Sequence, residues 1–139
     1  MITLSHLTMR LAGGGHQITI LDDVTLEIPD KQRVAIVGPS GSGKSTLLGL
    51  IAGLDRPTSG SIMLNGVEIS TMRESALARY RRDHIGYIFQ SFHLIPTLTA
   101  LENVLVPLEL AGISMAQDRA MHLLRTVGLG ERAHPYPVQ

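Results

Sequence analysis

The sequence predicts an α/β fold, and three patterns in its first half support this class. Apolar and polar residues alternate over residues 2–11 and 17–28, as in strands that have one covered face. Residues 34–37 form an apolar run, Val-Ala-Ile-Val, that is typical of a buried strand. A glycine-rich loop and a helix-forming run over residues 46–54 follow it directly. A strand, a glycine-rich loop and a helix in this order form a recurring unit of α/β proteins.

Composition excludes several classes of protein and partner. The chain is 44% hydrophobic and 17% charged, as expected of a globular protein, and its 12 basic and 12 acidic residues cancel. This balance argues against the basic surface that binds nucleic acid. The absence of cysteine excludes disulfides and thiolate metal sites and suits a reducing cytoplasm. There is neither an apolar run of membrane-spanning length nor a signal-peptide pattern, so we expect any membrane role to depend on a partner.

The N-terminal part is predicted to be antiparallel sheet. The alternation over residues 2–11 slips once, at His6 and Leu7. The triple glycine at residues 13–15 predicts a turn before the second alternating run. Pro-Asp-Lys at residues 29–31 predicts the turn after that run, and the chain then enters the apolar strand that precedes the loop.

The glycine-rich loop fits the phosphate-binding pattern Gly-x-x-x-x-Gly-Lys-[Ser/Thr]. Glycines allow successive backbone N–H groups to converge on one anion, and the N-terminus of the following helix adds partial positive charge. Lys44 can bring a full positive charge to the outer phosphates, and the Ser45 hydroxyl can bind magnesium. The predicted nucleotide-binding residues of the loop are Gly38, Pro39, Ser40, Gly41, Ser42, Gly43, Lys44, Ser45 and Thr46.

The stretch behind the loop predicts a helix and then a hairpin. Apolar residues recur at helical spacing over residues 46–54, and Gly53 and Pro57 are expected to end this helix. A short strand over residues 61–64 follows, and Asn65-Gly66 is a hairpin signal that leads into residues 67–69.

Capping boxes predict the starts of three further helices. The boxes are Thr71 with Glu74, Thr99 with Glu102, and Ser114 with Gln117. The first helix should reach about Arg82, the second should kink or break near Pro107, and the third should end at Gly128. The third is expected to bury Met115, Ala120, Leu123, Leu124 and Val127.

The helix predicted after Thr71 carries a cluster of arginines, and an apolar run follows it. Arg79, Arg81 and Arg82 are interpreted as a solvated helix face rather than a partner site. Residues 85–89 form a second apolar run, which predicts a strand ending at Gln90.

Several stretches around the loop resemble the ATP-binding subunit of ABC transporters. Residues 21–28 (LDDVTLEI) resemble its strand before the loop, residues 53–60 (GLDRPTSG) followed by Asn65-Gly66 resemble its "G-L-x-x-P-T-S-G … N-G" turn, and residues 88–90 (IFQ) resemble its Q-loop. Residues 89–104 (FQSFHLIPTLTALENV) resemble more narrowly the branch that serves lipoprotein release and macrolide export.

The resemblance implies an ABC-type nucleotide-binding domain of the P-loop NTPase class. Residues 1–33 would be its β subdomain, residues 34–90 part of its RecA-like core, and residues 91–139 the start of its helical subdomain. It implies ATP and Mg²⁺ as cofactors, with Gln90 sensing the γ-phosphate and, together with Ser45, contacting the metal. It also implies a transmembrane permease and a second, head-to-tail ATP-binding subunit as partners. The expected place is the cytoplasmic face of the cell membrane, where ATP hydrolysis would drive export or lipoprotein transport.

The sequence departs from the family in two places. Leu11 falls where an adenine-stacking aromatic residue is usual, and His16 is an alternative contact for the base. The chain stops where the signature motif would begin, so the Walker B acid, the catalytic glutamate and the switch histidine would lie beyond it. Neither Asp83 nor Glu109 fits a replacement Walker B strand. We therefore expect the 139 residues alone to bind nucleotide weakly, to turn over little, and to associate through open strand edges.

Two other functions remain to be compared with an ABC-type ATPase. A phosphate-loop kinase or GTPase would need its own second motif, such as Asn-Lys-x-Asp for guanine, and the sequence has none. A catalytically inactive nucleotide-binding or interaction module, from a shortened gene product, stays open because the deciding residues are absent.

Overall fold

The computed structural model describes residues 1–13 and 15–137 of the chain. Gly14, at the centre of the predicted glycine turn, lies outside the described residues, as do Val138 and Gln139. The chain divides into two compact units, which meet between Tyr87 and Ile88 in the sequence.

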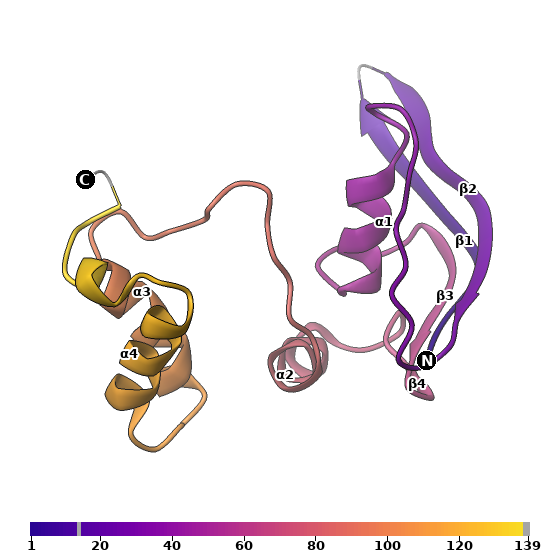
Figure 1. Ribbon diagram of the computed structural model, residues 1–139. Helices are drawn as coiled ribbons and strands as arrows, with labels where there is room; N and C mark the ends of the chain where they lie inside the picture. Colours follow the sequence, from indigo (N-terminus) through magenta and orange to yellow (C-terminus); the bar gives the residue numbers. More distant parts are fainter. Residues whose placement is uncertain (14, 138–139) are drawn as a thin grey trace. The chain divides into compact units, whose positions relative to one another are not determined.

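The first unit contains a four-stranded antiparallel sheet (Figure 1). Its strands are β1 (Ile2–Gly13), β2 (His16–Ile28), β3 (Ser59–Leu64) and β4 (Val67–Glu68), in the order β2-β1-β3-β4. The turn between β3 and β4 is at Asn65 and Gly66, which both have positive φ angles, as the hairpin signal predicts. The antiparallel β part and its hairpin are therefore confirmed.

The slip in the alternation of β1 is a β-bulge. The register between β1 and β2 shifts between Leu4 and Leu7, and His6 between them has a φ of 51°. Side chains three positions apart on a regular strand would point to opposite faces. Because the bulge absorbs one position, Leu4 and Leu7 are both fully buried on the same side.

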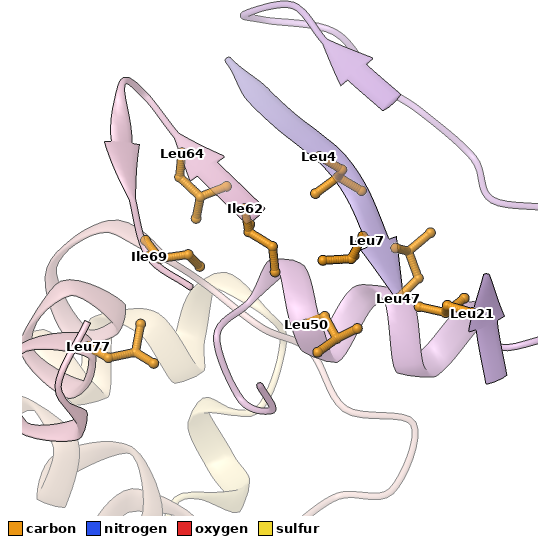
Figure 2. Close-up of a cluster of buried hydrophobic side chains, with 9 residues drawn as sticks. All are labelled: Leu4, Leu7, Leu21, Leu47, Leu50, Ile62, Leu64, Ile69 and Leu77. Carbon is orange, nitrogen blue, oxygen red and sulfur yellow. The ribbon is translucent and has the colours of Figure 1, made fainter. Parts of the chain in front are cut away.

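Helix α1 (Lys44–Ile51) packs on the inner face of this sheet. Figure 2 shows Leu47 and Leu50 of α1 beside Leu7 and Leu21 of the strands. The full buried cluster comprises Leu4, Leu7, Leu21, Leu47, Leu50, Ile62, Leu64, Ile69 and Leu77. This core fixes the helix that begins at the glycine-rich loop.

Helix α1 ends earlier than the predicted residue 54. The N–H of Leu54 donates to the carbonyl of Gly49 (2.9 Å) and that of Gly53 to Leu50 (3.0 Å), which is a Schellman motif. Gly53 has a φ of 64°, and a Cβ there would lie 2.9 Å from Cδ1 of Leu77. Gly53 therefore ends α1 as predicted, although the last helical residue is Ile51.

The two apolar runs predicted to be strands are irregular in the structure. Neither residues 34–37 nor residues 85–89 pair with another strand among the described residues. A strand is stabilised by backbone hydrogen bonds to a neighbouring strand. An apolar run indicates only that a segment tends to be buried and does not specify such a neighbour. Val37 is 86% exposed and Ile88 is 99% exposed, which is consistent with the absence of a paired strand on either side.

Only one of the three predicted capping boxes is present. Thr99 and Glu102 form a complete box at the start of α3 (Ala100–Leu110). Helix α2 (Glu74–His84) starts after Arg73, so Thr71 is not its N-cap and Glu74 is its first residue; no side-chain cap forms, and the Glu74 carboxylate accepts a hydrogen bond from Arg81. Helix α4 (Ala116–Thr126) starts after Met115, whose φ of 54° directs the chain into the helix without a side-chain cap.

The second unit is a pair of helices, α3 and α4, followed by the short 3-10 helix η1 (Gly130–Arg132). Its small core consists of Leu101, Ala120, Leu124 and Ala133. The predicted break at Pro107 is wrong, since α3 continues to Leu110; the kink stays a prediction. Because proline has no N–H, Pro107 cannot donate to the carbonyl four residues earlier. Its own carbonyl still accepts a hydrogen bond from the N–H of Ala111 (3.1 Å), so the helical pattern resumes after it.

The buried face predicted for α4 is only partly correct. Ala120 and Leu124 are buried, whereas Met115, Leu123 and Val127 are exposed. Met115 precedes the helix, and the small core of this unit covers only a narrow stripe of α4. Gly128 follows the helix with a φ of 77°, as predicted for the residue that ends it.

Candidate phosphate-binding site

The glycine-rich loop connects the irregular segment at residues 34–37 to α1. Gly38, Gly41 and Gly43 have φ angles of 156°, 79° and 85°. Gly43 is the N-cap of α1 and lies against β2, where a Cβ would be 3.0 Å from both the Ile20 carbonyl oxygen and Cδ2 of Leu21. Only glycine combines this backbone angle with this close approach.

The N-terminus of α1 has the features of an anion-binding helix end. Gly43 supplies no side-chain cap, and the first turn contains no acidic residue. The first N–H groups of a helix have no partner within the helix, and the aligned peptide dipoles make this end partially positive. Because no carboxylate competes for these donors in the first turn, they can bind an anion.

The ammonium group of Lys44 lies over the loop. Its Nζ atom donates to the carbonyl oxygens of Gly38 (2.9 Å) and Pro39 (2.7 Å), and more weakly to Oγ of Ser42 (3.4 Å). These acceptors are uncharged, and within residues 1–13 and 15–137 Lys44 forms no ion pair. The positive charge at the loop is therefore uncompensated, which favours a polyanion there.

Ser45 follows Lys44 in the first turn of α1 and is exposed. Both residues also line a hollow of about 460 Å³, whose other walls are mainly aliphatic, including Val34, Ile36 and Leu48. A polyanion does not suit such walls, so phosphates would lie at the loop rather than in this hollow. Among the described residues no cluster of three His, Asp or Glu side chains could hold a metal ion by itself.

Gln90 belongs to the second unit, whereas residues 38–46 belong to the first. Its side chain is exposed. The structure therefore brings the loop residues together, and the role of Gln90 stays a prediction.

The tip of the β1–β2 hairpin carries exposed aliphatic side chains. Leu11 is 47% exposed and pairs with Ile18, which is 55% exposed. Paired residues of an antiparallel ladder share one face, so the two side chains lie on the same side of the hairpin. The alternation in the sequence of β2 placed Ile18 on the apolar face of the strand, but it did not indicate that Ile18 lies beside Leu11 at the surface.

Sequence reasoning missed the role of Arg81. Its side chain is only 25% exposed, and it donates to the carbonyl of Gly53 (2.6 Å) and to Glu74 (2.9 Å). The interpretation of all three arginines as solvated is therefore wrong for Arg81. The spacing of Glu74, Leu77 and Arg81, at i, i+3 and i+7, was the signal that could have placed the three side chains on one face of the helix.

Comparison with known proteins identifies the family. The family model described as ABC transporter matches residues 21–138, which include the loop and most of both units. The chain belongs to the ABC transporter family. The resemblance inferred from the motifs around the loop is thereby confirmed.

Individual members of the ABC transporter family agree with this assignment. An uncharacterised ABC transporter ATP-binding protein of Mycobacterium tuberculosis is 46% identical over 98% of this chain and 42% of its own length. A macrolide export ATP-binding/permease protein of Burkholderia pseudomallei is 46% identical over all of this chain and 22% of its own length. An uncharacterised ABC transporter ATP-binding protein of Escherichia coli is 45% identical over all of this chain and 62% of its own length.

The fold also agrees with a solved structure of the family. An ATP-binding cassette, solved as a dimer in a post-hydrolysis state with ADP and Pi bound, matches with a TM-score of 0.93 and 38% identity. The match covers all of this chain and 62% of that one. The ABC-type nucleotide-binding fold is thus confirmed. The chain spans between 22% and 62% of the length of these relatives.

Proposed function

We propose that this chain provides the phosphate-binding part of the ATP-binding subunit of an ABC transporter. The observation that carries the proposal is the uncompensated Lys44 ammonium above a loop of three positive-φ glycines, at the uncapped N-terminus of α1. These residues fit a magnesium-bound nucleoside triphosphate, which needs converging N–H donors, one cation and a hydroxyl ligand.

Each residue type has a distinct role in this proposal. Backbone N–H groups of residues 38–46 bind the phosphate oxygens, and Lys44 exchanges its carbonyl acceptors for charged ones. Ser45 contributes a hydroxyl to magnesium, and Gln90 contacts the metal and the γ-phosphate as a residue of the Q-loop. Bound ATP supplies a γ-phosphoryl group whose transfer to water releases the free energy for transport.

Hydrolysis requires a carboxylate that orients water in line with the γ-phosphate. Among the described acids, Asp83 is paired with Arg82, and Glu109 lies in α3 of the second unit. We propose that residues 1–139 bind ATP without sustained turnover and that the protein in its full length is the ATPase. The third possibility, a catalytically inactive interaction module, predicts no turnover at any length.

The proposal includes partners and a location. The solved cassette is a dimer, and one relative is named as a macrolide exporter with a permease portion. We propose a second ATP-binding subunit, a transmembrane permease, and export or lipoprotein transport at the cytoplasmic face of the membrane. Within the part of the chain that the structure describes, no helix has the length and apolar composition needed to cross a membrane. We also propose that residues 1–33, 34–90 and 91–139 are the β subdomain, core part and helical subdomain.

The decisive test is nucleotide binding by Lys44→Ala. Losing a charge-assisted contact should raise the Kd for MgATP by about tenfold or more, as measured by isothermal titration calorimetry. Arg119→Ala, which removes an exposed cation from α4 of the second unit, is the matched control and should leave the Kd unchanged. The proposal would be contradicted if the wild-type protein bound no nucleoside triphosphate, or if the two variants lost the same affinity for MgATP.

A further inference from the structure

The C-terminal end of α1 is supported from outside the helix. Helix α1 has eight residues, and helices this short are marginal without tertiary support. Its last turn contains no basic side chain that could offset the partial negative charge of that end. Its N-terminus is also uncapped, and the proposed function assigns that end to phosphate. At the other end the Schellman motif satisfies the carbonyls of Gly49 and Leu50, but a compensating positive charge can come only from outside the helix.

Arg81 of α2 supplies that charge. One guanidinium nitrogen donates to the carbonyl oxygen of Gly53 at 2.6 Å, across 28 residues of sequence. Leu77 lies one turn earlier on α2, and a Cβ on Gly53 would come within 2.9 Å of its Cδ1 atom. Two side chains on one face of α2 thus contact the residue that ends α1.

The guanidinium is itself held in place. Its other terminal nitrogen donates to Oε1 of Glu74 at 2.9 Å, and Oε2 of Glu74 is 3.6 Å from Arg56. The hydrogen bond from Arg81 lowers the pKa of Glu74, so this carboxylate is charged at neutral pH. A planar guanidinium can bind a carbonyl and a carboxylate at once, whereas a lysine ammonium at this position would retain mainly the positive charge.

We propose that Arg81 is a positioning residue for nucleotide binding: by holding the Gly53 end of α1, it maintains the helix whose opposite end binds the phosphates. The inference rests on the proposed ATP-binding function. The physical link is a population effect. An anion binds only while the first turn of α1 is formed, so its apparent affinity falls in proportion to the time that the helix is frayed or displaced. A cation near the helix C-terminus stabilises the helical form.

The test is a set of titrations with the protein expressed at its natural length. Kd values and binding stoichiometries are measured by calorimetry for MgATP, MgADP and AMP with wild type, Arg81→Met, Arg81→Lys and Arg79→Met. Arg81→Met should weaken ATP and ADP binding by about three- to tenfold at unchanged stoichiometry. AMP, which has one phosphate, should change less than ATP. Arg81→Lys should recover most of the affinity because it keeps the charge.

Arg79→Met is the matched control. Arg79 is an exposed arginine of the same helix, and it has no hydrogen bond or ion pair to any described residue. Its substitution should leave every Kd unchanged. The proposal is overturned if Arg81→Met binds ATP within about twofold of wild type, if Arg79→Met loses as much affinity, or if Arg81→Lys is no better than Arg81→Met. A lower stoichiometry at unchanged Kd would indicate a purely structural role and would also overturn it.

A second variant decides the matter if Arg81→Met does not fold. Glu74→Gln leaves Arg81 in place and removes the charge that orients it, so ATP binding should weaken by about two- to fourfold. Wild-type affinity in a folded Glu74→Gln variant would overturn the inference. Failure of the wild-type protein to bind ATP would instead refute the proposed function, so the two failures are distinguishable.

Discussion

Gly43 is the residue at which the phosphate loop meets the sheet. Its φ of 85° and the nearby Ile20 carbonyl act against any side chain there. The motif pattern predicted a glycine at this position for its backbone freedom alone. The contact with β2 adds a second reason, which depends on tertiary structure and so could not be read from the loop sequence.

We predict that Gly43→Ala destabilises the fold by about 1–3 kcal/mol, because it adds backbone strain and a clash with β2. Gly41→Ala is the matched control: Gly41 has a φ of 79°, but nothing lies within 4 Å of a Cβ there. Urea unfolding should therefore show a larger loss for Gly43→Ala than for Gly41→Ala. Equal losses would mean that only the backbone angle matters.

Single residues also decide the proposed contact with the base. Leu11 and Ile18 offer apolar contact at the hairpin tip but no ring for stacking, so we predict weak discrimination between ATP and GTP. Leu11→Tyr should tighten ATP binding by roughly 0.5–1.5 kcal/mol, measured as a change in Kd. Thr19→Tyr, one position away on β2 and so on the opposite face, should have no such effect. Tighter binding only in Thr19→Tyr would place the base elsewhere.

At the scale of elements, the start of α3 depends on a complete capping box. The Glu102 N–H donates to the Thr99 hydroxyl (3.3 Å), and the Thr99 N–H donates to the Glu102 carboxylate (2.7 Å). We predict that Thr99→Ala destabilises the second unit by about 1 kcal/mol, measured by hydrogen exchange of the α3 amides. Ser114→Ala, at a predicted capping box that does not form, should change the stability of the second unit by less than about 0.5 kcal/mol. A comparable effect of Ser114→Ala would contradict the cap assignment.

The same box predicts a pH dependence. The backbone hydrogen bond from Thr99, and then its hydroxyl, lower the pKa of Glu102 below its ordinary value of 4.5. A lowered pKa in the folded state stabilises the fold above the unfolded-state pKa, and this contribution is lost as pH falls through the folded-state pKa. The difference in α3 protection between wild type and Glu102→Gln should therefore shrink below about pH 4.5. A constant difference down to pH 2 would show that Glu102 is not held this way.

The second unit also explains why some elements were predicted better than others. The spacing of apolar residues correctly predicted that α3 and α4 are helices, and the capping pattern correctly identified Thr99 as the N-cap of α3. Ser114 fits the same pattern as Thr99, yet α4 begins after Met115 in a left-handed conformation. A capping pattern states which hydrogen bonds are possible, whereas the path of the preceding chain decides which of them form.

At the scale of the whole molecule, sequence patterns predicted elements that satisfy their hydrogen bonds locally or with near neighbours. The β1–β2 and β3–β4 hairpins and the helices belong to this class. Residues 34–37 and 85–89 do not, because a buried strand depends on neighbours that are often distant in sequence. The bent backbone of the glycine-rich loop was predictable because its motif specifies backbone geometry. The Arg81 contact with Gly53 was not, since it joins segments 28 residues apart.

The exposed apolar runs predict association of the 139-residue chain. Val37 and Ile88 are 86% and 99% exposed, in segments that join no sheet among the described residues. Ile88→Lys should reduce concentration-dependent association, measured by sedimentation velocity, because a charge in an exposed apolar segment opposes its pairing with another chain. Met115→Lys places the same charge on a side chain that is 74% exposed but lies at a helix start. Equal suppression by both would indicate general hydrophobic contact rather than strand pairing.

The bulges in the β1–β2 hairpin make the β2 edge of the sheet irregular. Strand β2 is one of the two outer strands, and its ladder with β1 is interrupted three times, including at His6 and Asp23, whose side chains are hydrogen-bonded. Each interruption bends the strand and increases its twist, so its free backbone groups do not form a straight row. A second sheet cannot align along such a margin. The irregular geometry of this long outer strand therefore opposes pairing with the edge of another sheet, and the charged residues Asp22, Asp23 and Glu27 that the strand carries add to this protection.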